Sequence, residues 1–302
     1  MNQFTTRAAM LGLGLMGLVA GGTATAQTAA PAAGAQQLAQ AAPPVREITK
    51  IAGEVYRFRN NFHYSVFAVT PAGVIVTDPI HPDAAQWLKN EIKTRFNQPI
   101  RYLIYSHDHR DHIHGGEVFA DTAIVVAHEN AKPTILGEKR PTAVPNLTFS
   151  DKMTIELGGT VVNLIHTGRN HSDNSIVMHF PRERLVFAVD FIPVESVAFR
   201  NLPDGWMPDW LDSLKRVEAM DFDILVPGHG PVGKKEHVRM FRDYLETLHG
   251  EVLAAARAGK TLDQVKQEVK LSKYESWGGY KEMFALNVEG MYRLVQNNRL
   301  GN

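Results

Sequence analysis

The chain of 302 residues contains no cysteine. This absence excludes disulfide bonds, a thiolate nucleophile, thiolate metal ligands and a lipid anchor attached through cysteine. An excess of charge is lacking too, because 32 lysines and arginines balance 32 aspartates and glutamates and no basic block stands out. Nucleic-acid binding through a basic patch is therefore not expected. The hydrophobic fraction of 44% is that of an ordinary globular protein.

The N-terminal apolar run, LGLGLMGLVAGG, is too short and too rich in glycine to span a membrane comfortably. It follows a segment with one basic residue, Arg7, and it precedes Ala24-Thr25-Ala26, which has the form of a signal-peptide cleavage site. The alternative is a membrane anchor. We predict instead that residues 1–26 are a cleaved signal peptide and that the mature protein is periplasmic or secreted, without a stable membrane anchor.

The remaining chain divides by its patterning into three parts. Residues 27–45 are rich in Ala, Gln and Pro and are expected to form a flexible leader outside the fold. Over 46–260, strand-like runs alternate with turn residues in two halves that each carry helices, which predicts an α/β layered sandwich. Residues 261–302 are expected to form a helical extension packed on this domain. The expected strands are 54–59, 64–70, 73–79, 100–106, 123–128, 152–158, 160–166, 175–180, 184–191 and 223–229, and the expected helices are 81–96, 209–220, 234–259, 261–269 and 282–298.

A histidine-rich loop follows the strand-like run IRYLIYS. It reads YSHDHRDHIHGG and holds four of the 13 histidines within eight residues. His107 and His109 lie two apart, so on an extended segment they point to the same side, whereas Asp111 and His112 follow at a turn. Neutral imidazole binds Zn²⁺ well and carboxylate completes such sites, so this loop could supply ligands to two adjacent metal ions. The alternative is a polar surface loop with chance histidines.

Further candidate ligands lie at the ends of other predicted strands. They are His171 in HTGRNHSDNS, Asp190 at the end of RLVFAVD, and His229 in VPGHG. Each alone is a weak signal, but together with the loop they supply seven ligands for two metals. The other histidines are interpreted as surface or hydrogen-bonded residues, among which His63, in the turn RNNFHY, is nearest the expected mouth of the site.

These residues carry a resemblance to a known family. HDHRDH matches the His-x-His-x-Asp-His signature of the metallo-β-lactamase-fold hydrolases, and the later ligands fall in that superfamily's order. The run GVIVTDP resembles the family's first motif, whose aspartate, here Asp78, supports the ligands from behind. The resemblance implies a four-layer αβ/βα sandwich and a small-molecule substrate.

It also implies two Zn²⁺ ions per chain. The first ion would be held by His107, His109 and His171. The second would be held by Asp111, His112 and His229. Asp190 would bridge the two together with a hydroxide, and Asp111 would act as the catalytic residue that orients this nucleophile. Two cations lower the pKa of a shared water and polarise a carbonyl or phosphoryl oxygen.

Zinc β-lactamases of the largest subclass are similar to this chain around HTGRNHSDN, but three positions depart from them. Asp190 stands where that subclass has a cysteine ligand, His112 where it has mostly Arg or Lys, and Pro193 where it has a carboxylate-binding Lys. Asp and His at these positions resemble glyoxalase II, lactonases and phosphodiesterases. Glyoxalase II itself fits poorly, because it acts on a cytoplasmic thioester.

We therefore expect a periplasmic dinuclear zinc hydrolase that attacks a carbonyl substrate, which would be a lactam, lactone, ester or thioester, with β-lactamase activity left open. One alternative is a phosphodiesterase or sulfur-handling enzyme that uses the same site. Another is a catalytically inert zinc-binding protein, against which the intact ligand set argues.

Substrate contacts are expected from the loop 191–208, because so long a segment without regular structure is uncommon unless it is functional. We expect Phe199 and Trp206 to form an apolar wall and Arg200 to anchor an acidic group. In the alternative, Trp206 and Met207 only pin the loop to the core.

The signal peptide gives a first testable prediction. Protein recovered from the periplasm of a host that secretes it should begin near Gln27, because cleavage is expected after Ala26. N-terminal sequencing decides the matter, and periplasmic protein with an intact Met1 would contradict both the signal peptide and the assignment to the periplasm.

Overall fold

The computed structural model describes residues 43–299. The predicted signal peptide, 1–26, lies outside the described residues, as does nearly all of the predicted leader, 27–45, so both stay predictions. Within the described part of the chain, no helix is both long and apolar enough to cross a membrane.

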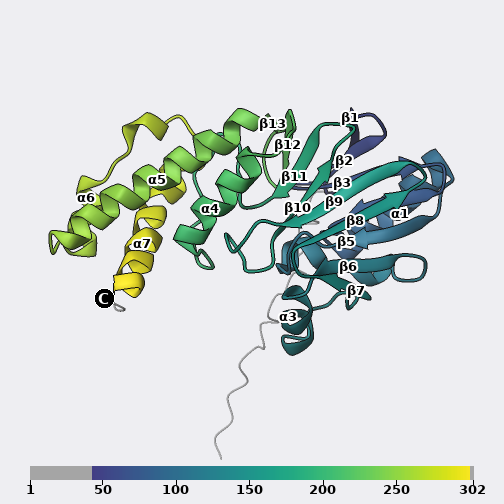
Figure 1. Ribbon diagram of the computed structural model, residues 1–302, viewed down its shortest axis with the longest axis horizontal. Helices are drawn as coiled ribbons and strands as arrows, with labels where there is room; N and C mark the ends of the chain where they lie inside the picture. Colours follow the sequence, from purple (N-terminus) through teal and green to yellow (C-terminus); the bar gives the residue numbers. More distant parts are fainter. Residues whose placement is uncertain (1–42, 300–302) are drawn as a thin grey trace, which may run out of the picture. The chain divides into compact units, whose positions relative to one another are not determined.

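Two β-sheets form the centre of the fold (Figure 1). The seven strands of the first sheet lie side by side in chain order: β1 (Arg46–Ala52), β2 (Val55–Asn60), β3 (His63–Thr70), β4 (Gly73–Thr77), β5 (Ile100–Ile104), β6 (Ile124–His128) and β7 (Leu147–Phe149). The second sheet runs in reverse order from β13 (Gly233–Lys234) through β12 (Ile224–Pro227), β11 (Leu185–Val189), β10 (Ile176–Phe180) and β9 (Thr160–His166) to β8 (Lys152–Leu157).

The helices lie between these strands in the sequence and after the last of them. They are α1 (Pro82–Phe96), α2 (Arg110–Ile113), α3 (Ala131–Gly137), α4 (Met207–Glu218), α5 (Lys235–Arg257), α6 (Leu262–Glu268) and α7 (Tyr280–Arg299), with short 3₁₀ turns η1 (Gly116–Val118) and η2 (Ser272–Tyr274). The expected strands and helices are confirmed to within a few residues at their ends. Strands β1, β7 and β13 and helices α2 and α3 were not expected.

Helix α1 shows how local sequence sets these elements. His81 Nδ1 accepts a hydrogen bond from the backbone N–H of Asp83 (3.3 Å), and Pro82 occupies the first turn, so the helix begins here. It ends at Asn97, whose φ of 50° is left-handed. Its apolar face buries Ala84, Ala85, Leu88 and Ile92. As a crossover it makes β4 and β5 parallel, and their carboxyl ends therefore meet at one edge.

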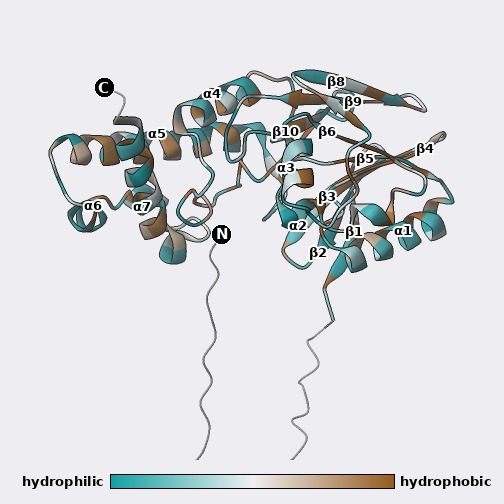
Figure 2. Cartoon of the chain, turned by 90° about the horizontal axis from the view of Figure 1, so that it is seen from below, coloured by the Kyte–Doolittle hydropathy of each residue, from teal (hydrophilic) through white to brown (hydrophobic). Residues whose placement is uncertain are grey.

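Three apolar layers hold the fold together. One, which includes Leu88 and Leu103, lies between α1 and the first sheet. A second, which includes Ile75, lies between the two sheets. The third packs α4, α5, α6 and α7 on the outer face of the second sheet. In Figure 2 the middle strands are mostly brown, for hydrophobic residues, while α1 and α6 carry much teal. The predicted four-layer αβ/βα sandwich is confirmed.

The layer between the sheets gives a prediction about stability. Phe187 of β11 is fully buried there and pairs with Met178 and Val226 on neighbouring strands. Phe187→Ala should lower the free energy of unfolding by about 3–5 kcal/mol, because it leaves a cavity between two sheets. Phe62→Ala is the matched control, because Phe62 is 80% exposed and its loss should change stability by less than about 0.5 kcal/mol. Urea unfolding measures both, and equal losses would contradict this view of the core.

Candidate metal centre

The seven predicted ligands all follow strand ends of the two sheets. His107 and His109 lie in the loop after β5, and that loop continues into α2, which carries Asp111 and His112. In the second sheet, His171 lies between β9 and β10, Asp190 follows β11, and His229 follows β12. The structure brings the seven side chains together into two groups that share Asp190. The parallel pairs β4–β5 and β11–β12 place these loops at adjacent edges of the sandwich.

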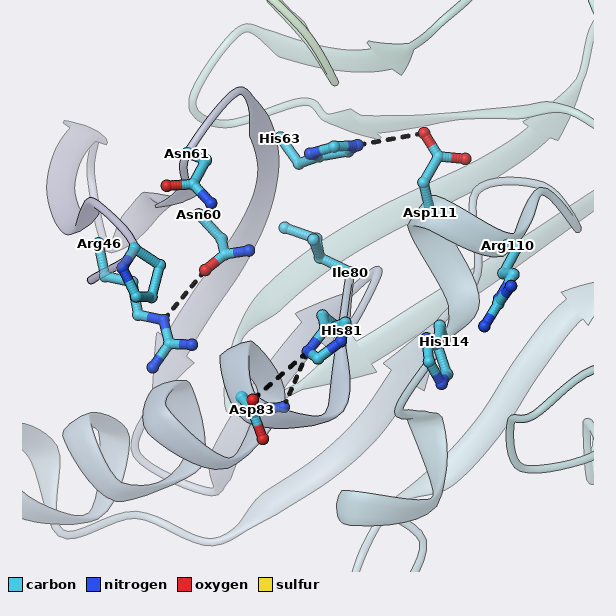
Figure 3. Close-up of a pocket in the computed structure, with 11 residues that line it drawn as sticks. Arg46, Asn60, Asn61, His63, Ile80, His81, Asp83, Arg110, Asp111 and His114 are labelled. Atoms are coloured by element: carbon cyan, nitrogen blue, oxygen red, sulfur yellow. Dashed lines mark hydrogen bonds and ion pairs between the residues drawn. The ribbon is translucent and has the colours of Figure 1, made fainter. Parts of the chain in front are cut away.

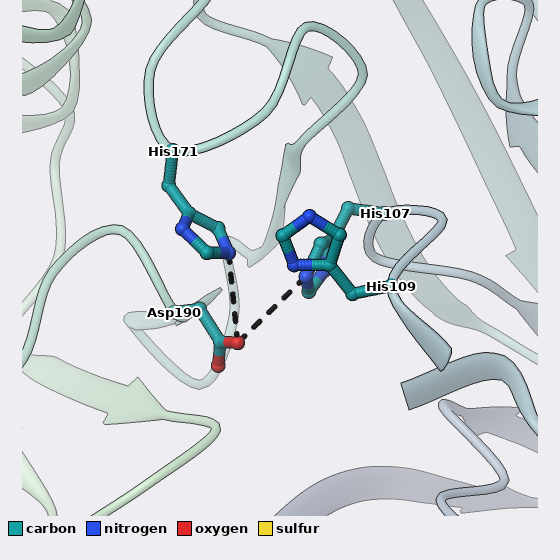
Figure 4. Close-up of side chains that lie close together, drawn as sticks. All are labelled: His107, His109, His171 and Asp190. Carbon is teal, nitrogen blue, oxygen red and sulfur yellow. Dashed lines mark ion pairs between the residues drawn. The ribbon is translucent and has the colours of Figure 1, made fainter. Parts of the chain in front are cut away.

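The first group contains three histidines around Asp190 (Figure 4). Its candidate ligand atoms all lie within 4.8 Å of one another. The Nε2 atoms of His107 and His171 lie 3.7 and 3.8 Å from Asp190 Oδ2. The ring of His109 lies 4.5 Å from the rings of both other histidines, centroid to centroid. On the pocket side, Asp204 Oδ2 lies 3.5 Å from His109 Nε2. This spacing suits one cation among imidazoles.

The second group contains Asp111, His112 and His229 beside the same Asp190. His112 Nε2 lies 2.9 Å from Asp190 Oδ2, and His229 Nε2 lies 3.5 Å from Asp190 Oδ1. Asp111 Oδ2 lies 3.7 Å from His112 Nε2 and 3.8 Å from His229 Nε2. Asp190 therefore faces both groups, which is the position that a bridging carboxylate requires.

Hydrogen bonds to the Nδ1 atoms, on the side of the rings away from the cluster centre, fix which ring nitrogen is available to a metal. Asp78 Oδ2 accepts from His112 Nδ1 (3.1 Å) and from the hydroxyl of Ser106 (2.6 Å). That hydroxyl accepts from His107 Nδ1 (2.9 Å), and the carbonyl of Phe62 accepts from His229 Nδ1 (2.9 Å). With the proton on Nδ1, each ring turns the lone pair of Nε2 toward the centre. The prediction that Asp78 supports ligands fits these contacts.

The buried polar atoms at the centre test whether a cation fits. Among the described residues, His107, His112 and His171 have buried Nε2 atoms without a hydrogen-bond partner, and so does Asp190 Oδ1. His112 Nε2 is close to Asp190 but lacks the geometry of a hydrogen bond. An unsatisfied buried polar atom costs about 1–3 kcal/mol, so four at one point call for a common partner. A divalent cation in each of the two groups would satisfy them, and nitrogen and oxygen donors of this kind are those that zinc prefers.

The charge states of the cluster agree with this role. Burial lowers the pKa of His171 to about 4, and burial together with neighbouring histidines lowers that of His107 well below its usual value. Both rings are therefore neutral at pH 7, as ligands must be. Burial opposes ionisation of Asp190, but the charge of His112 outweighs it and holds the Asp190 pKa well below its usual range. Burial lowers the His112 pKa, yet Asp190 and Asp78 raise it overall, so a metal that bound there would displace a proton.

Gly228 makes room for the shared carboxylate. A Cβ atom at this position would lie 2.6 Å from Asp190 Oδ1 and 3.0 Å from His112 Cε1. The Gly228 N–H also donates to the carbonyl of Val189 (2.8 Å), and Val189 has a φ of 51°, which is strained for a β-branched residue. The sequence VPGHG thus needs glycine here because any side chain would push on two candidate ligands.

Two pockets meet over the cluster. The first, of about 550 Å³, is lined by five of the seven candidate ligands and by an apolar wall. The second, of about 570 Å³, shares His63, Arg110 and Asp111 with the first. Figure 3 shows the ring of His63 pointing toward the carboxylate of Asp111. The two pockets give a substrate room on both sides of this pair.

The expected substrate wall is only partly in the pocket. The structure places Phe199, 60% exposed, on the pocket lining, but it places neither Arg200 nor Trp206 there. The ring of Trp206 lies 5.6 Å from the guanidinium of Arg169. Arg200 lies over the Phe199 ring at 4.9 Å, and Met207 is buried in the core.

His63 is a site residue that we interpreted as a surface histidine. Its Nε2 donates to Asp111 Oδ2 (3.2 Å), and its ring lies 4.7 Å from that of His229. Burial raises the Asp111 pKa, but the hydrogen bond from His63 and the charge of His112 outweigh it and hold this pKa well below its usual range. The signal in the sequence was its position in a hairpin turn near the mouth.

Asp108 was also passed over, because it occupies a variable position of the motif. It is buried, its N–H donates to Asn174 Oδ1 (2.9 Å), and its Oδ1 accepts from Asn174 Nδ2 (3.0 Å). Its other oxygen pairs with Arg140 at 3.4 Å. These contacts tie the loop of His107 to the segment that follows His171.

Gly228 gives a prediction for the metal centre. Gly228→Ala should lower the affinity for zinc by about tenfold or more, because the new methyl group displaces Asp190 and His112. Gly250→Ala is the control, since Gly250 lies in α5 with nothing within 4 Å of an added Cβ. Competition with a chromophoric chelator measures both affinities. Unchanged affinity in Gly228→Ala would refute the tight packing described here.

Comparison with known proteins places this geometry in a family. The family model described as the Metallo-beta-lactamase superfamily matches residues 60–229, a range that contains all seven candidate ligands. The 2,4-dinitroanisole O-demethylase subunit alpha of Nocardioides sp. (strain JS1661) is 26% identical over 231 residues, which cover 74% of this chain and 70% of that one. A type 2 metallo-beta-lactamase of Bacteroides fragilis is 24% identical over 217 residues, which cover 66% of this chain and 87% of that one.

The fold also resembles that of solved metallo-beta-lactamases. A metallo-beta-lactamase from Pontibacter korlensis superposes with a TM-score of 0.60 at 22% identity and covers 67% of this chain and 99% of that one. The expectation of an enzyme is confirmed, because the relatives are metalloenzymes. Since the family model spans more than half of its residues, the chain belongs to the metallo-β-lactamase superfamily.

Proposed function

We propose that this protein is an exported, dinuclear zinc hydrolase that cleaves an ester, lactone, thioester or lactam. The observation that carries the proposal is the pair of ligand groups sharing Asp190, with buried ring nitrogens that lack any other partner among the described residues. His107, His109 and His171 would hold one ion, and Asp111, His112 and His229 the other. When bound, the ions supply a water of lowered pKa and polarise the substrate's carbonyl oxygen. The features of residues 1–26 support export.

The chain's own groups position the reactants and move protons. Asp111 stands at the junction of the two pockets with its Oδ2 bonded to His63 Nε2. Asp111 would accept a hydrogen bond from the attacking water and orient it, and the imidazole of His63 can take up the proton that hydrolysis releases and return it to the leaving group. Asp78 and Ser106 keep the ligand rings turned inward, so that no reorganisation is needed during turnover.

Features of the pocket favour an ester or lactone over a lactam drug. Pro193 lines the pocket where a cationic side chain would hold a drug carboxylate, and the neighbouring wall is apolar. The names of two relatives suggest reactions to test. One relative is a metallo-beta-lactamase. The other is an O-demethylase of 2,4-dinitroanisole, which makes an activated aryl methyl ether the second candidate substrate.

The test combines metal analysis with a substrate panel. Protein purified without chelator should hold about two zinc ions per chain and lose activity to chelators until zinc is restored. The panel is p-nitrophenyl acetate, a γ-lactone, nitrocefin, 2,4-dinitroanisole and bis-p-nitrophenyl phosphate. We expect the highest kcat/KM on the ester or the lactone. Highest activity on the phosphodiester or the ether would replace the proposed substrate class.

Ligand variants separate the site from general damage to the protein. Asp190→Ala and His171→Ala should each lose zinc and lower kcat/KM by at least about 100-fold. Asp212→Ala and His249→Ala are the controls, because both residues lie on helices away from the cluster. Full zinc and near-parental rates in either ligand variant would remove that residue from the site. An active protein with one zinc ion or none would refute the dinuclear site, and a zinc-loaded protein inert on every substrate would favour the zinc-binding alternative.

A further inference from the structure

The C-terminal helix α7 reaches the substrate pocket. Met283, in its first turn, lines the 550 Å³ pocket together with several of the candidate ligands. It does so beside residues of the segment 191–206, which connects Asp190 to α4. The side chains that make this wall are Val189, Pro193, Val197, Phe199, Pro203 and Met283. The wall is apolar, and one of its members comes from a part of the chain about 90 residues away from the others.

A buried amide on α7 holds the segment 191–206 in place. Asn287 is fully buried, and its Nδ2 donates to the backbone carbonyls of Ala198 (2.8 Å) and Arg200 (2.5 Å). Its Oδ1 accepts from the hydroxyl of Tyr244 (2.5 Å) on α5. Both N–H groups of the amide are thus used on the two residues that flank Phe199. A buried amide satisfied in this way fixes one loop conformation.

The next turns of α7 continue the contact. A Cβ atom on Gly290 would lie 1.9 Å from the carbonyl oxygen of Asn201, so only glycine lets the loop approach the helix this closely. Arg293 donates to the carbonyls of Asn201 (3.2 Å) and Leu202 (2.8 Å). Leu202 has a φ of 50° and Arg200 a φ of 47°, conformations that need support from outside the loop.

The start of the segment is also tied to the C-terminal part. The N–H of Val197 donates to the carbonyl of Gly278 (3.0 Å), and the N–H of Gly278 donates to the carbonyl of Glu195 (2.9 Å). Within the described residues, the segment 191–206 belongs to neither sheet. Its shape therefore depends on α7 and on the residues just before it.

We infer that the C-terminal segment 278–293 completes the apolar wall of the substrate pocket and holds it in place, and thereby selects substrates with an apolar acyl group. The inference rests on the proposed function for the identity of the reacting group. Met283 is the contact residue, and Asn287 is a positioning residue that acts through Phe199. Burial of each methylene against the wall should tighten binding about fourfold until the pocket is filled.

The first experiment measures binding without turnover. Zinc-loaded protein is titrated calorimetrically with the straight-chain alkyl hydroxamates of two and six carbons, because the hydroxamate group binds zinc and the chain probes the wall. The natural protein should bind the longer compound at least tenfold more tightly. Met283→Ala should weaken the longer compound about fivefold and the shorter one less than twofold. Leu286→Ala is the matched control, since Leu286 is exposed on the same helix and does not line the pocket.

The second experiment separates positioning from packing. Asn287→Asp keeps the shape and the acceptor for Tyr244 but loses the N–H groups that hold Ala198 and Arg200. With p-nitrophenyl hexanoate it should raise KM about tenfold while kcat on p-nitrophenyl acetate and the zinc content stay unchanged. Asn297→Asp, at an exposed position of α7, is the control. If Asn287→Asp does not fold, the Met283→Ala titration still decides the inference.

The outcomes distinguish this inference from the proposed function. Equal affinity of the natural protein for the two hydroxamates, or equal losses for both compounds in Met283→Ala, would overturn the inference. A chain-length preference that Met283→Ala reduces by the expected factor supports it, even if no ester is hydrolysed. If the preference is seen but no ester is hydrolysed, the proposed reaction is wrong and the inference about the pocket wall is still supported.

Discussion

The buried carboxylate of Asp190 is the group on which the site depends. Its side chain is only 12% exposed, and four histidine Nε2 atoms lie between 2.9 and 3.8 Å from its oxygens. A charged group in such a place must be paired, because burial of an unpaired charge is costly. Protonated His112 can pair it in part, but three ring nitrogens and one carboxylate oxygen are left without hydrogen bonds among the described residues. A cation completes this arrangement, whereas a hydrogen-bonded network of the same residues would need a different geometry.

Strained backbone surrounds this carboxylate, and the sheets hold it. Three residues that are not glycine have positive φ next to the ligands: Asp78 (25°), Ile80 (70°) and Val189 (51°). Each conformation is fixed by a hydrogen bond to a neighbouring strand or loop, for Asp78 to Ile104, for Ile80 to His112, and for Val189 from Gly228. Strain of this kind persists only where the surrounding structure determines it. The parallel strand pairs therefore do more than present loops, because they also hold the backbone beside the ligands in conformations it would not adopt alone.

How much of this could be read from the sequence depends on the range of the interactions involved. The ligand positions could be predicted, because metal chemistry limits their residue types and strand ends limit their place. Helix α1 could be predicted because its cap, apolar face and end are all local. Strand β7 has only three residues, and α3 has a proline in its first turns, so neither carries a clear period. His63 was missed because its contact with Asp111 joins residues 48 positions apart. The direction of Trp206 could not be predicted, because size and polarity do not tell which way a loop side chain points.

In the proposed function, the metal ligands and the pocket wall belong to parts of the chain that are held in place by different interactions. The candidate ligands stand in loops at the edges of two sheets, whose hydrogen bonds hold the strands from which these loops begin. The pocket wall stands on the segment 191–206, whose carbonyls are bound by side chains of α7 instead of by a strand. A substitution on α7 can therefore change the wall while every ligand stays in place. One scaffold can in this way keep its metal centre and change its substrate, which is why the family resemblance defines the chemistry of this protein far better than its substrate.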